Sequence, residues 1–276
     1  PDTLAEGIRK QGGEIKCRAE AEELIGKGGR IVRVRCADGD EYEGDIFIGA
    51  VHPASVCRMI RQEGGMKPSY RNRIFRQMNT FGAFTVSLVL KPGKIPYFNY
   101  NRYVYRNADV WSSVSTGGID RVMISCKVPE SGSYAQQIDL LAPFLWEECL
   151  PWAQTEVGRR GEDYLLWKER IADACLALAE TVMPGLRDAV VRRYISTPLT
   201  YAGYLHAPEG SAYGIRKDAE APLEVLLSPH TPIPNLYLTG QSLMMHGVQG
   251  VTQTALFTCA GILGRDWIWK HIVEEK

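Results

Sequence analysis

The sequence lacks both glycine patterns that commonly hold a phosphate at the start of a helix: neither G-x-G-x-x-G nor G-x-x-x-x-G-K-[ST] occurs in it. It has no apolar run of about 18 residues, so we expect no transmembrane helix, and it shows no signal peptide. It also has no excess charge, because 32 basic residues balance 32 acidic ones. We therefore expect no nucleic-acid partner, since such proteins usually carry a basic surface.

Cysteines at metal-binding or redox spacing are missing as well. The seven cysteines are scattered, no two of them form a Cys-x-x-Cys pair, and no His-x-x-x-His occurs. This pattern is typical of reduced thiols in a cytosolic protein, and it predicts neither a disulfide framework nor a metal site. The glycine cluster at 26–29 lies between two strand-like segments, so we interpret it as a hairpin turn rather than a phosphate loop.

Hydrophobic periodicity predicts a chain of mixed helices and strands, without internal repeats. We leave 136–146 open between strand and helix, and expect a long loop over 196–234. The predicted helices cover 1–11 (followed by extended structure from Glu14), parts of 51–75, 162–183, Gly250 to Leu263, and 267–272; the predicted strands cover 21–25, 30–36, 41–50, 80–92, 97–106, 121–128, 190–195 and 235–240.

The most informative stretch is IPNLYLTGQSLMMHGVQGV, residues 233–251. An apolar strand ends at Gly240, a short loop carries His246 and Gly247, and a helix follows from Gly250. Such a bend aims free backbone amides and the positive end of a helix dipole at one point, and its glycines allow a flat or anionic group to approach closely. A flavin pyrimidine edge fits this description; a plain strand–turn–helix packing unit is the alternative that the residues leave open.

Both ends of the chain resemble the phytoene desaturase and carotenoid isomerase superfamily, and within it the retinol saturase branch and its bacterial relatives. The similar segments are STPLTYAGYLHAPEGSAYG (196–214), TPIPNLYLTGQSLMMHGVQGVTQTALFTCAGIL (231–263) and GGEIKCRAEAEELIGKGGRIVRVRCADGDEYEGDIFIGAVHP (12–53). The middle, about 58–190, is similar only in general character. The resemblance implies a two-domain flavoprotein with FAD as its cofactor.

The fold class implied by this resemblance is mixed α/β (α+β). Residues 1–57 and 232–276 would form a truncated FAD/NAD(P)-binding domain of GR2 type without its N-terminal Rossmann motif. Residues 58–231 would form a substrate domain with an antiparallel sheet and helices. We expect such a fragment to bind FAD weakly or not at all, to be inactive alone, and to self-associate through exposed core surface.

The resemblance also assigns roles to individual residues. The turn at Gly240 and Gln241 would face the ribityl chain and pyrophosphate, where related flavoproteins often have an acid. Ala21 stands where the family usually has a valine that touches adenine. His246 and Tyr204 are candidates for handling a proton. The helix start, lying under the flavin pyrimidine, would comprise Gly247, Val248, Gln249, Gly250, Val251 and Thr252.

The chemistry so implied is hydride transfer between flavin N5 and a carbon of an apolar, polyene-like substrate, as reduction, desaturation or isomerisation. Substrates of this kind partition into membranes, so a cytoplasmic protein with peripheral membrane contact is expected. Two other interpretations stay open: a flavin-dependent amine oxidase, and a non-catalytic domain that binds a hydrophobic ligand or a partner chain.

Overall fold

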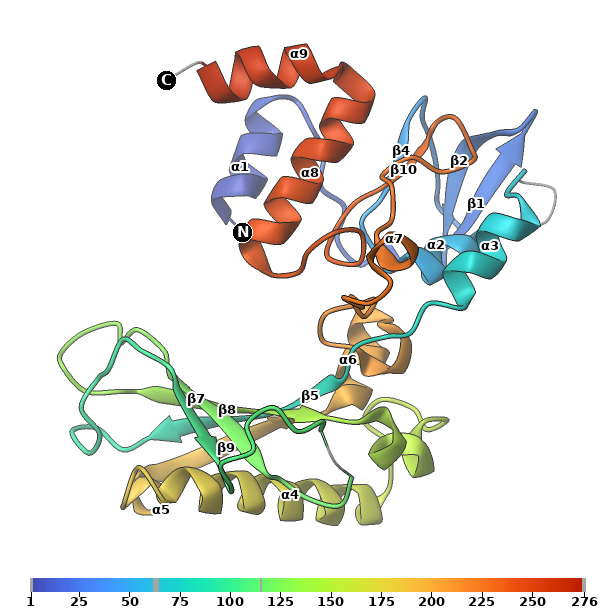
Figure 1. Ribbon diagram of the computed structural model, residues 1–276. Helices are drawn as coiled ribbons and strands as arrows, with labels where there is room; N and C mark the ends of the chain where they lie inside the picture. Colours follow the sequence, from blue (N-terminus) through green and yellow to red (C-terminus); the bar gives the residue numbers. More distant parts are fainter. Residues whose placement is uncertain (1, 62–64, 115, 275–276) are drawn as a thin grey trace. The chain divides into compact units, whose positions relative to one another are not determined.

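The computed structural model describes residues 2–61, 65–114 and 116–274, and it divides into two compact units. Unit 1 combines the residues up to Arg76 with those from Leu226 onward, and unit 2 is the continuous stretch Gln77–Val225 between them (Figure 1). Both units contain helices and sheets, so the predicted mixture of the two is confirmed. No helix in the described part of the chain has the length and hydrophobicity that crossing a bilayer requires.

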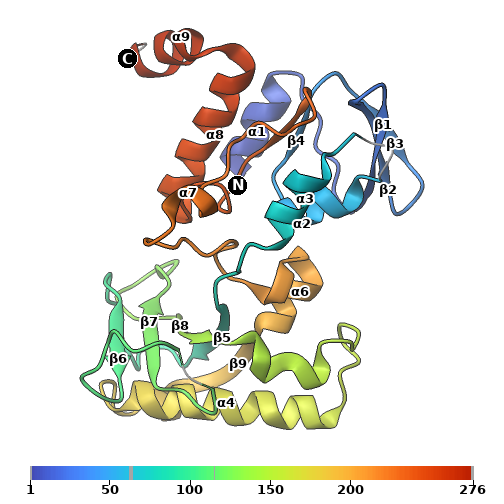
Figure 2. The ribbon, with the colours of Figure 1, turned by 45° about the vertical axis from the view of Figure 1, so that its right-hand side comes forward.

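Unit 1 contains an antiparallel meander of order β1-β2-β3 and a parallel pair, β4 with β10. Two helices, α1 and α8, lie side by side in it (Figures 1 and 2). Its elements are α1 (Asp2–Lys10), β1 (Ala21–Lys27), β2 (Arg30–Cys36), β3 (Glu41–Glu43), β4 (Phe47–Gly49), α2 (Pro53–Met59), α3 (Pro68–Phe75), β10 (Leu236–Leu238), α8 (Gly247–Leu263), α9 (Arg265–Ile268) and a π-helical segment, η4 (Trp269–Glu274).

The turn between β1 and β2 is the hairpin predicted from the sequence. Gly28 and Gly29 have φ angles of 60° and 75°, a left-handed pair that glycine adopts without steric cost. By contrast, Glu14 to Cys17 pairs with no strand, so the extended structure predicted there is not part of a sheet.

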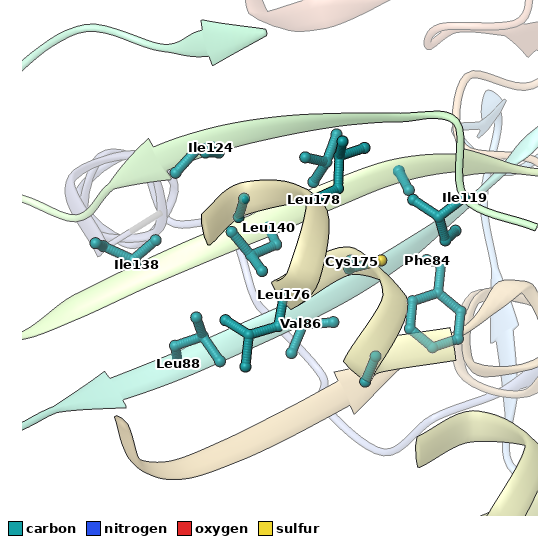
Figure 3. Packing of buried hydrophobic residues seen from close by; sticks show 14 of the residues in the cluster. Phe84, Val86, Leu88, Ile119, Ile124, Ile138, Leu140, Cys175, Leu176 and Leu178 are labelled. Atoms are coloured by element: carbon teal, nitrogen blue, oxygen red, sulfur yellow. The ribbon is translucent and has the colours of Figure 1, made fainter. Parts of the chain in front are cut away.

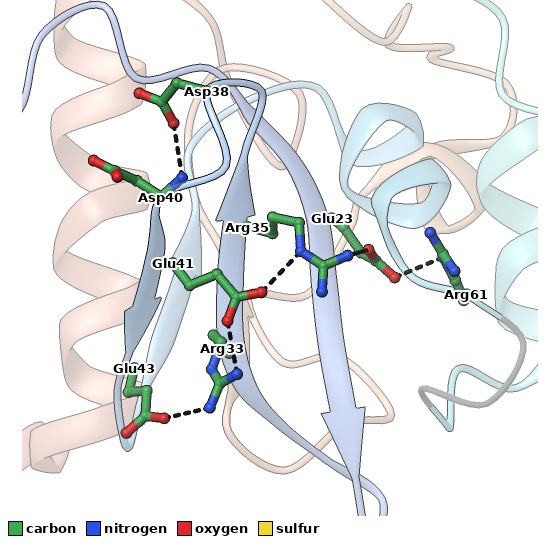
Figure 4. Close-up of polar contacts among 8 residues, drawn as sticks. All are labelled: Glu23, Arg33, Arg35, Asp38, Asp40, Glu41, Glu43 and Arg61. Atoms are coloured by element: carbon green, nitrogen blue, oxygen red, sulfur yellow. Dashed lines mark hydrogen bonds and ion pairs between the residues drawn. The ribbon is translucent and has the colours of Figure 1, made fainter.

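The exposed face of the meander carries a chain of ion pairs across its strands (Figure 4). Arg33 contacts Glu41 at 2.6 Å and Glu43 at 2.5 Å, and Arg35 contacts Glu41 and Glu23 at 2.8 Å each. Hydrogen bonds from the two guanidinium groups hold the pKa of the Glu41 carboxyl below its usual value, and the bond from Arg35 has the larger effect. Exposed ion pairs of this kind contribute little stability. Because these pairs join neighbouring strands, they favour the observed register of the meander.

The edges of unit 1 differ from the domain boundaries that the sequence suggested at 57/58 and 231/232. Ile60 is 1% exposed, forms a bridge with Leu24 of β1 and accepts a hydrogen bond from the Arg71 side chain, so Ile60 links α3 to the meander. At the other boundary the Leu227 amide donates to the Leu243 carbonyl at 3.0 Å. Both flanking segments therefore fold with unit 1. Three residues of the predicted range 51–75, namely 62–64, lie outside the described residues, as do Pro1 and 275–276.

Unit 2 is built on a five-stranded antiparallel sheet of order β6-β7-β8-β5-β9. The long helix α4 runs along one face of this sheet (Figure 2). Its elements are β5 (Gly82–Leu90), β6 (Arg102–Tyr105), β7 (Arg121–Cys126), β8 (Gln137–Phe144), η2 (Trp146–Trp152), α4 (Glu162–Glu180), α5 (Leu186–Ala189), β9 (Val190–Ser196), α6 (Pro198–Leu205), η3 (Pro208–Gly210) and α7 (Pro222–Val225).

The core of unit 2 lies between the sheet and α4 (Figure 3). Every second residue of β5 and β8 is buried, which is the period of a strand with one face on the core. This alternation decides the segment 136–146, left open by the sequence, in favour of a strand. The fully enclosed side chains include Phe84, Val86, Leu88, Ile138, Leu140 and Cys175, each 0% exposed.

The predicted loop over 196–234 is wrong in its first half, where α6 forms. Thr197 and Thr200 make a reciprocal capping box, and Pro198 occupies the first turn, where a missing N–H costs nothing. The sequence Thr-Pro-Leu-Thr is thus a helix start. Gly210 then packs against the Pro198 backbone with a φ of 56°, so the segment after α6 is ordered rather than loose.

Candidate functional site

Two parallel strands of unit 1 end together at one edge of their sheet. Leu238 of β10 is paired with Gly49 of β4, and the Thr239 amide donates to the Gly49 carbonyl at 3.0 Å. Gly240 has a φ of 99°, and a Cβ there would lie 3.4 Å from the Ala50 carbonyl oxygen. The carboxyl ends of adjacent parallel strands are where open α/β sheets bind ligands, so this edge is the candidate site.

Asn235 fixes this edge to the rest of unit 1. The side chain is 3% exposed; its Oδ1 accepts from the Ile31 amide at 3.0 Å, and its Nδ2 donates to the Ile31 and Asp45 carbonyls at 2.7 and 3.0 Å. The Asn235 carbonyl accepts from the Phe47 amide at 2.8 Å. One residue therefore joins β2, β4 and β10, which come from opposite ends of the chain.

Helix α8 is held against β10 by a narrow stripe of small residues. Gly250, Thr254 and Thr258 are its buried positions, spaced one turn apart, and the Thr258 hydroxyl bonds the Leu238 carbonyl at 3.0 Å. A Cβ on Gly250 would come within 2.7 Å of Met245. The stripe thus positions the start of α8 close to the strand end that precedes it.

The start of α8 is exposed and carries no side-chain cap. The helix begins at Gly247, which has a φ of 78°, and not at Gly250 as predicted. His246 occupies the N-cap position without a capping hydrogen bond, and Val248 is 86% exposed. In the described chain no acceptor bonds the amides of 247–249, so these amides and the helix dipole are available to a negatively polarised group.

Thr239, which sequence reasoning missed, adds a polar group to the same edge. Its hydroxyl is buried and finds no hydrogen-bond partner among the described residues. A buried hydroxyl without a partner is costly unless a further group bonds it. The sequence pattern that could have indicated this residue is a threonine between an apolar strand and a glycine. Together with the amides of α8 and the close approach at Gly240, this donor set fits a hydroxylated chain joined to a flat ring, as in FAD.

The earlier start of α8 narrows the set of predicted flavin contacts. Gly247, Val248 and Gln249 lie exposed in the first turn. Val251 is half-buried within the helix, and the Thr252 hydroxyl donates to the Val248 carbonyl at 2.8 Å. Only the first three residues therefore have exposed backbone amides, whereas Gly250 is buried with its carbonyl bonded by Thr254, and the Thr252 hydroxyl is used inside the helix.

The remaining predicted residues lie in separate places. Gln241 is half-buried in the bend, and Ala21 is the exposed first residue of β1, paired with Cys36. His246 is exposed at the start of α8 in unit 1. Tyr204 lies on α6 of unit 2 and is 68% exposed. The roles assigned to these residues stay predictions.

Titratable groups at the site give no sign of a metal centre. Among the described residues no three His, Cys, Asp or Glu side chains are grouped as metal ligands. All seven cysteines are described and carry free thiols. Burial raises the pKa of Cys57, on α2, to about 11, which makes it a poor nucleophile.

Solved structures define the class of fold. An oxidoreductase from Methanosarcina mazei matches 92% of this chain and 52% of its own, with a TM-score of 0.57 and 12% identity. A putrescine oxidase redesigned in its cofactor binding matches 95% of this chain and 52% of its own, also with a TM-score of 0.57, at 14% identity. At these identities the likeness shows a shared fold and nothing finer. No family model matches the sequence.

Sequence relatives define the relationship more closely. The all-trans-retinol 13,14-reductase of Macaca fascicularis is 35% identical over 130 residues, and the human protein of that name is 34% identical over 130 residues. Each match covers 46% of this chain but only 21% of the relative. The chloroplastic prolycopene isomerase of Daucus carota is 26% identical over 251 residues, covering 87% of this chain and 38% of that protein. The resemblance to the phytoene desaturase and carotenoid isomerase superfamily is thereby confirmed.

Proposed function

We propose that this chain supplies the flavin-facing edge and the substrate unit of an FAD-dependent oxidoreductase acting on carbon–carbon bonds of an apolar polyene. Its relatives are a reductase named for retinol and an isomerase named for prolycopene, and both compounds are conjugated polyenes. The shared fold with an oxidoreductase and a putrescine oxidase supports the same class. The matched segments span a minority of each sequence relative, so the activity of the whole protein is part of the proposal.

The observation that carries the proposal is the meeting of two strand ends with an uncapped helix start. The Thr239 hydroxyl and the turn at Gly240 and Gln241 would bind the hydroxylated chain of FAD. The amides of 247–249 would face its N1–C2=O2 edge, where negative charge gathers on reduction. Bound FAD supplies a hydride donor or acceptor at flavin N5. The Rossmann motif of the predicted GR2-type domain is no part of this sequence, and the adenine contact at Ala21 rests on the resemblance alone.

The chain's own residues would position the substrate and exclude water. A site that aligns an apolar molecule beside the cofactor needs few polar groups. His246 of unit 1 is the side chain we propose for holding a proton near the reacting carbon, and the role that the resemblance gives to Tyr204 of unit 2 stays a prediction. Peripheral membrane contact would follow from a substrate that resides in lipid.

The test uses protein expressed from its gene together with whatever coding sequence adjoins this chain. We expect the purified protein to be yellow, and its reduced flavin to be reoxidised, or its oxidised flavin bleached, on addition of an apolar polyene. The 276-residue chain alone serves as a second sample, and we expect it to bind FAD weakly. Protein that carries no flavin in the first sample contradicts the proposal, and flavin that responds to amines but not to polyenes favours the amine-oxidase alternative.

A further inference from the structure

A separate pocket of about 490 Å³ lies within unit 2, where the loop before α4, the first turns of α4 and helix α6 meet. Its size is that of a site for a small ligand, about 300–1,000 Å³. It is formed without any residue of the edge described above. The residues that matter for its chemistry are Val157, Arg160, Tyr164, Leu165, Lys168 and Tyr204.

Arg160 brings a fixed positive charge to this pocket. Its guanidinium donates to the carbonyls of Trp152 (3.2 Å), Thr155 (2.9 Å) and Leu199 (3.2 Å), and it lies 5.7 Å from the centre of the Tyr164 ring. All of these acceptors are neutral. The side chain is therefore held in place while no carboxylate of the described chain neutralises it.

Lys168 brings a second cation close to the same ring. Its ammonium lies 5.5 Å from the centre of Tyr164, and no carboxylate of the described residues forms an ion pair with it. Two neighbouring acids on α4 have other partners: Asp163 accepts from the Trp152 indole at 2.8 Å, and Glu169 contacts Arg193. The residues that line the pocket include two cations and no acid, so a bound anion would interact with both.

The wall beside these cations is apolar and open to solvent. Val157 is 43% exposed and Leu165 is 52% exposed, and Ile195 is half-buried at the end of β9. Exposed aliphatic side chains next to unpaired cations suit a ligand with a charged head and a hydrocarbon body. We propose that this pocket binds an amphipathic anion, a carboxylate or phosphate carried on an aliphatic chain. The site needs no FAD, and Tyr204 is the lining residue that it shares with the candidates for proton handling.

The test compares two neighbouring leucines. Leu165 lines the pocket and Leu166, 66% exposed on the same helix, does not. Binding of decanoate and decyl phosphate to the full chain is measured by calorimetry, with decanol and inorganic phosphate as probes that lack the charge or the tail. Leu165→Glu should weaken decanoate binding about tenfold or more by placing a carboxylate beside the ligand's own, whereas Leu166→Glu should leave it unchanged.

Substitutions of Lys168 test the contribution of the positive charge. Lys168→Met should weaken binding about tenfold, Lys168→Arg should preserve it, and exposed Lys94→Met should have no effect. Vesicles of anionic and of neutral phospholipid distinguish a lipid headgroup from a free amphiphile as the ligand. Capture by anionic vesicles that Lys168→Met abolishes indicates a lipid headgroup. Decanoate binding without capture by vesicles indicates a free amphiphile. The proposal is overturned if decanol binds as well as decanoate, or if both leucine variants behave alike.

Discussion

We expect loss of the Asn235 side chain to destabilise unit 1. Asn235→Ala deletes three side-chain hydrogen bonds, to the amide and carbonyl of Ile31 and the carbonyl of Asp45, at a position only 3% exposed. Each bond contributes about 1 kcal/mol net, so the loss of three bonds removes about 3 kcal/mol. We expect the free energy of unfolding of unit 1 to fall by about 3 kcal/mol, which corresponds to a melting temperature lower by about 10 °C.

The assay is hydrogen exchange followed by mass spectrometry, because it reports each unit separately. Amides in β2, β4 and β10 should exchange faster in Asn235→Ala, while those in the sheet of unit 2 keep their protection. Asn72→Ala is the matched control, since Asn72 is exposed on α3 of the same unit. A loss below about 1 kcal/mol, or a loss of the same size in Asn72→Ala, would refute the view that this amide joins the three strands.

Three further predictions concern packing and charge. Thr258→Val removes a buried hydroxyl bonded to β10 and should lower the stability of unit 1 by about 1 kcal/mol in urea unfolding, with Thr252→Val, on the exposed side of α8, nearly neutral. Gly210→Ala places a Cβ 2.2 Å from a backbone oxygen at a φ of 56° and should destabilise unit 2 by about 3 kcal/mol or more; Gly132→Ala, at a φ of 79° in open space, should cost only about 1 kcal/mol. Burial raises the pKa of Cys149 from 9.0 to about 12, so its contribution to stability is complete below pH 9 and is lost as the pH rises toward 12. Unfolding measured between pH 8 and pH 11 should therefore show a smaller alkaline loss in Cys149→Ala.

Local patterns in the sequence predicted much of the fold. The hairpin at Gly28 and Gly29 and the strands on either side of it depend on turn chemistry and alternation, which a short window contains. Helix α4 is likewise marked by its own periodicity. The capping box at Thr197 is equally local, but the surrounding prolines and glycines favour a loop over 196–234 and so conceal the start of α6.

The features that escaped prediction depend on contacts between distant parts of the chain. Asn235 is the first residue of the predicted strand 235–240, and no local pattern marks its side-chain contact with Ile31, 204 positions earlier. The limits of unit 1 depend on such contacts too, since Ile60 packs against β1. At the candidate site the sequence indicated the bend and its glycines, but not the orphan hydroxyl of Thr239, whose burial only the fold reveals.

The central claim is that the open start of α8 faces the negative edge of a flavin. Val248→Glu puts a carboxylate into that first turn at a side chain 86% exposed, and Ala255→Glu puts the same charge on an exposed position further along the helix. The measurement is the reduction potential of the flavin in protein expressed with its adjoining coding sequence. We expect Val248→Glu to lower this reduction potential, because a nearby carboxylate disfavours the anionic reduced flavin. We expect Ala255→Glu to leave the potential unchanged. Equal potentials in both variants and the parent protein would contradict the central claim.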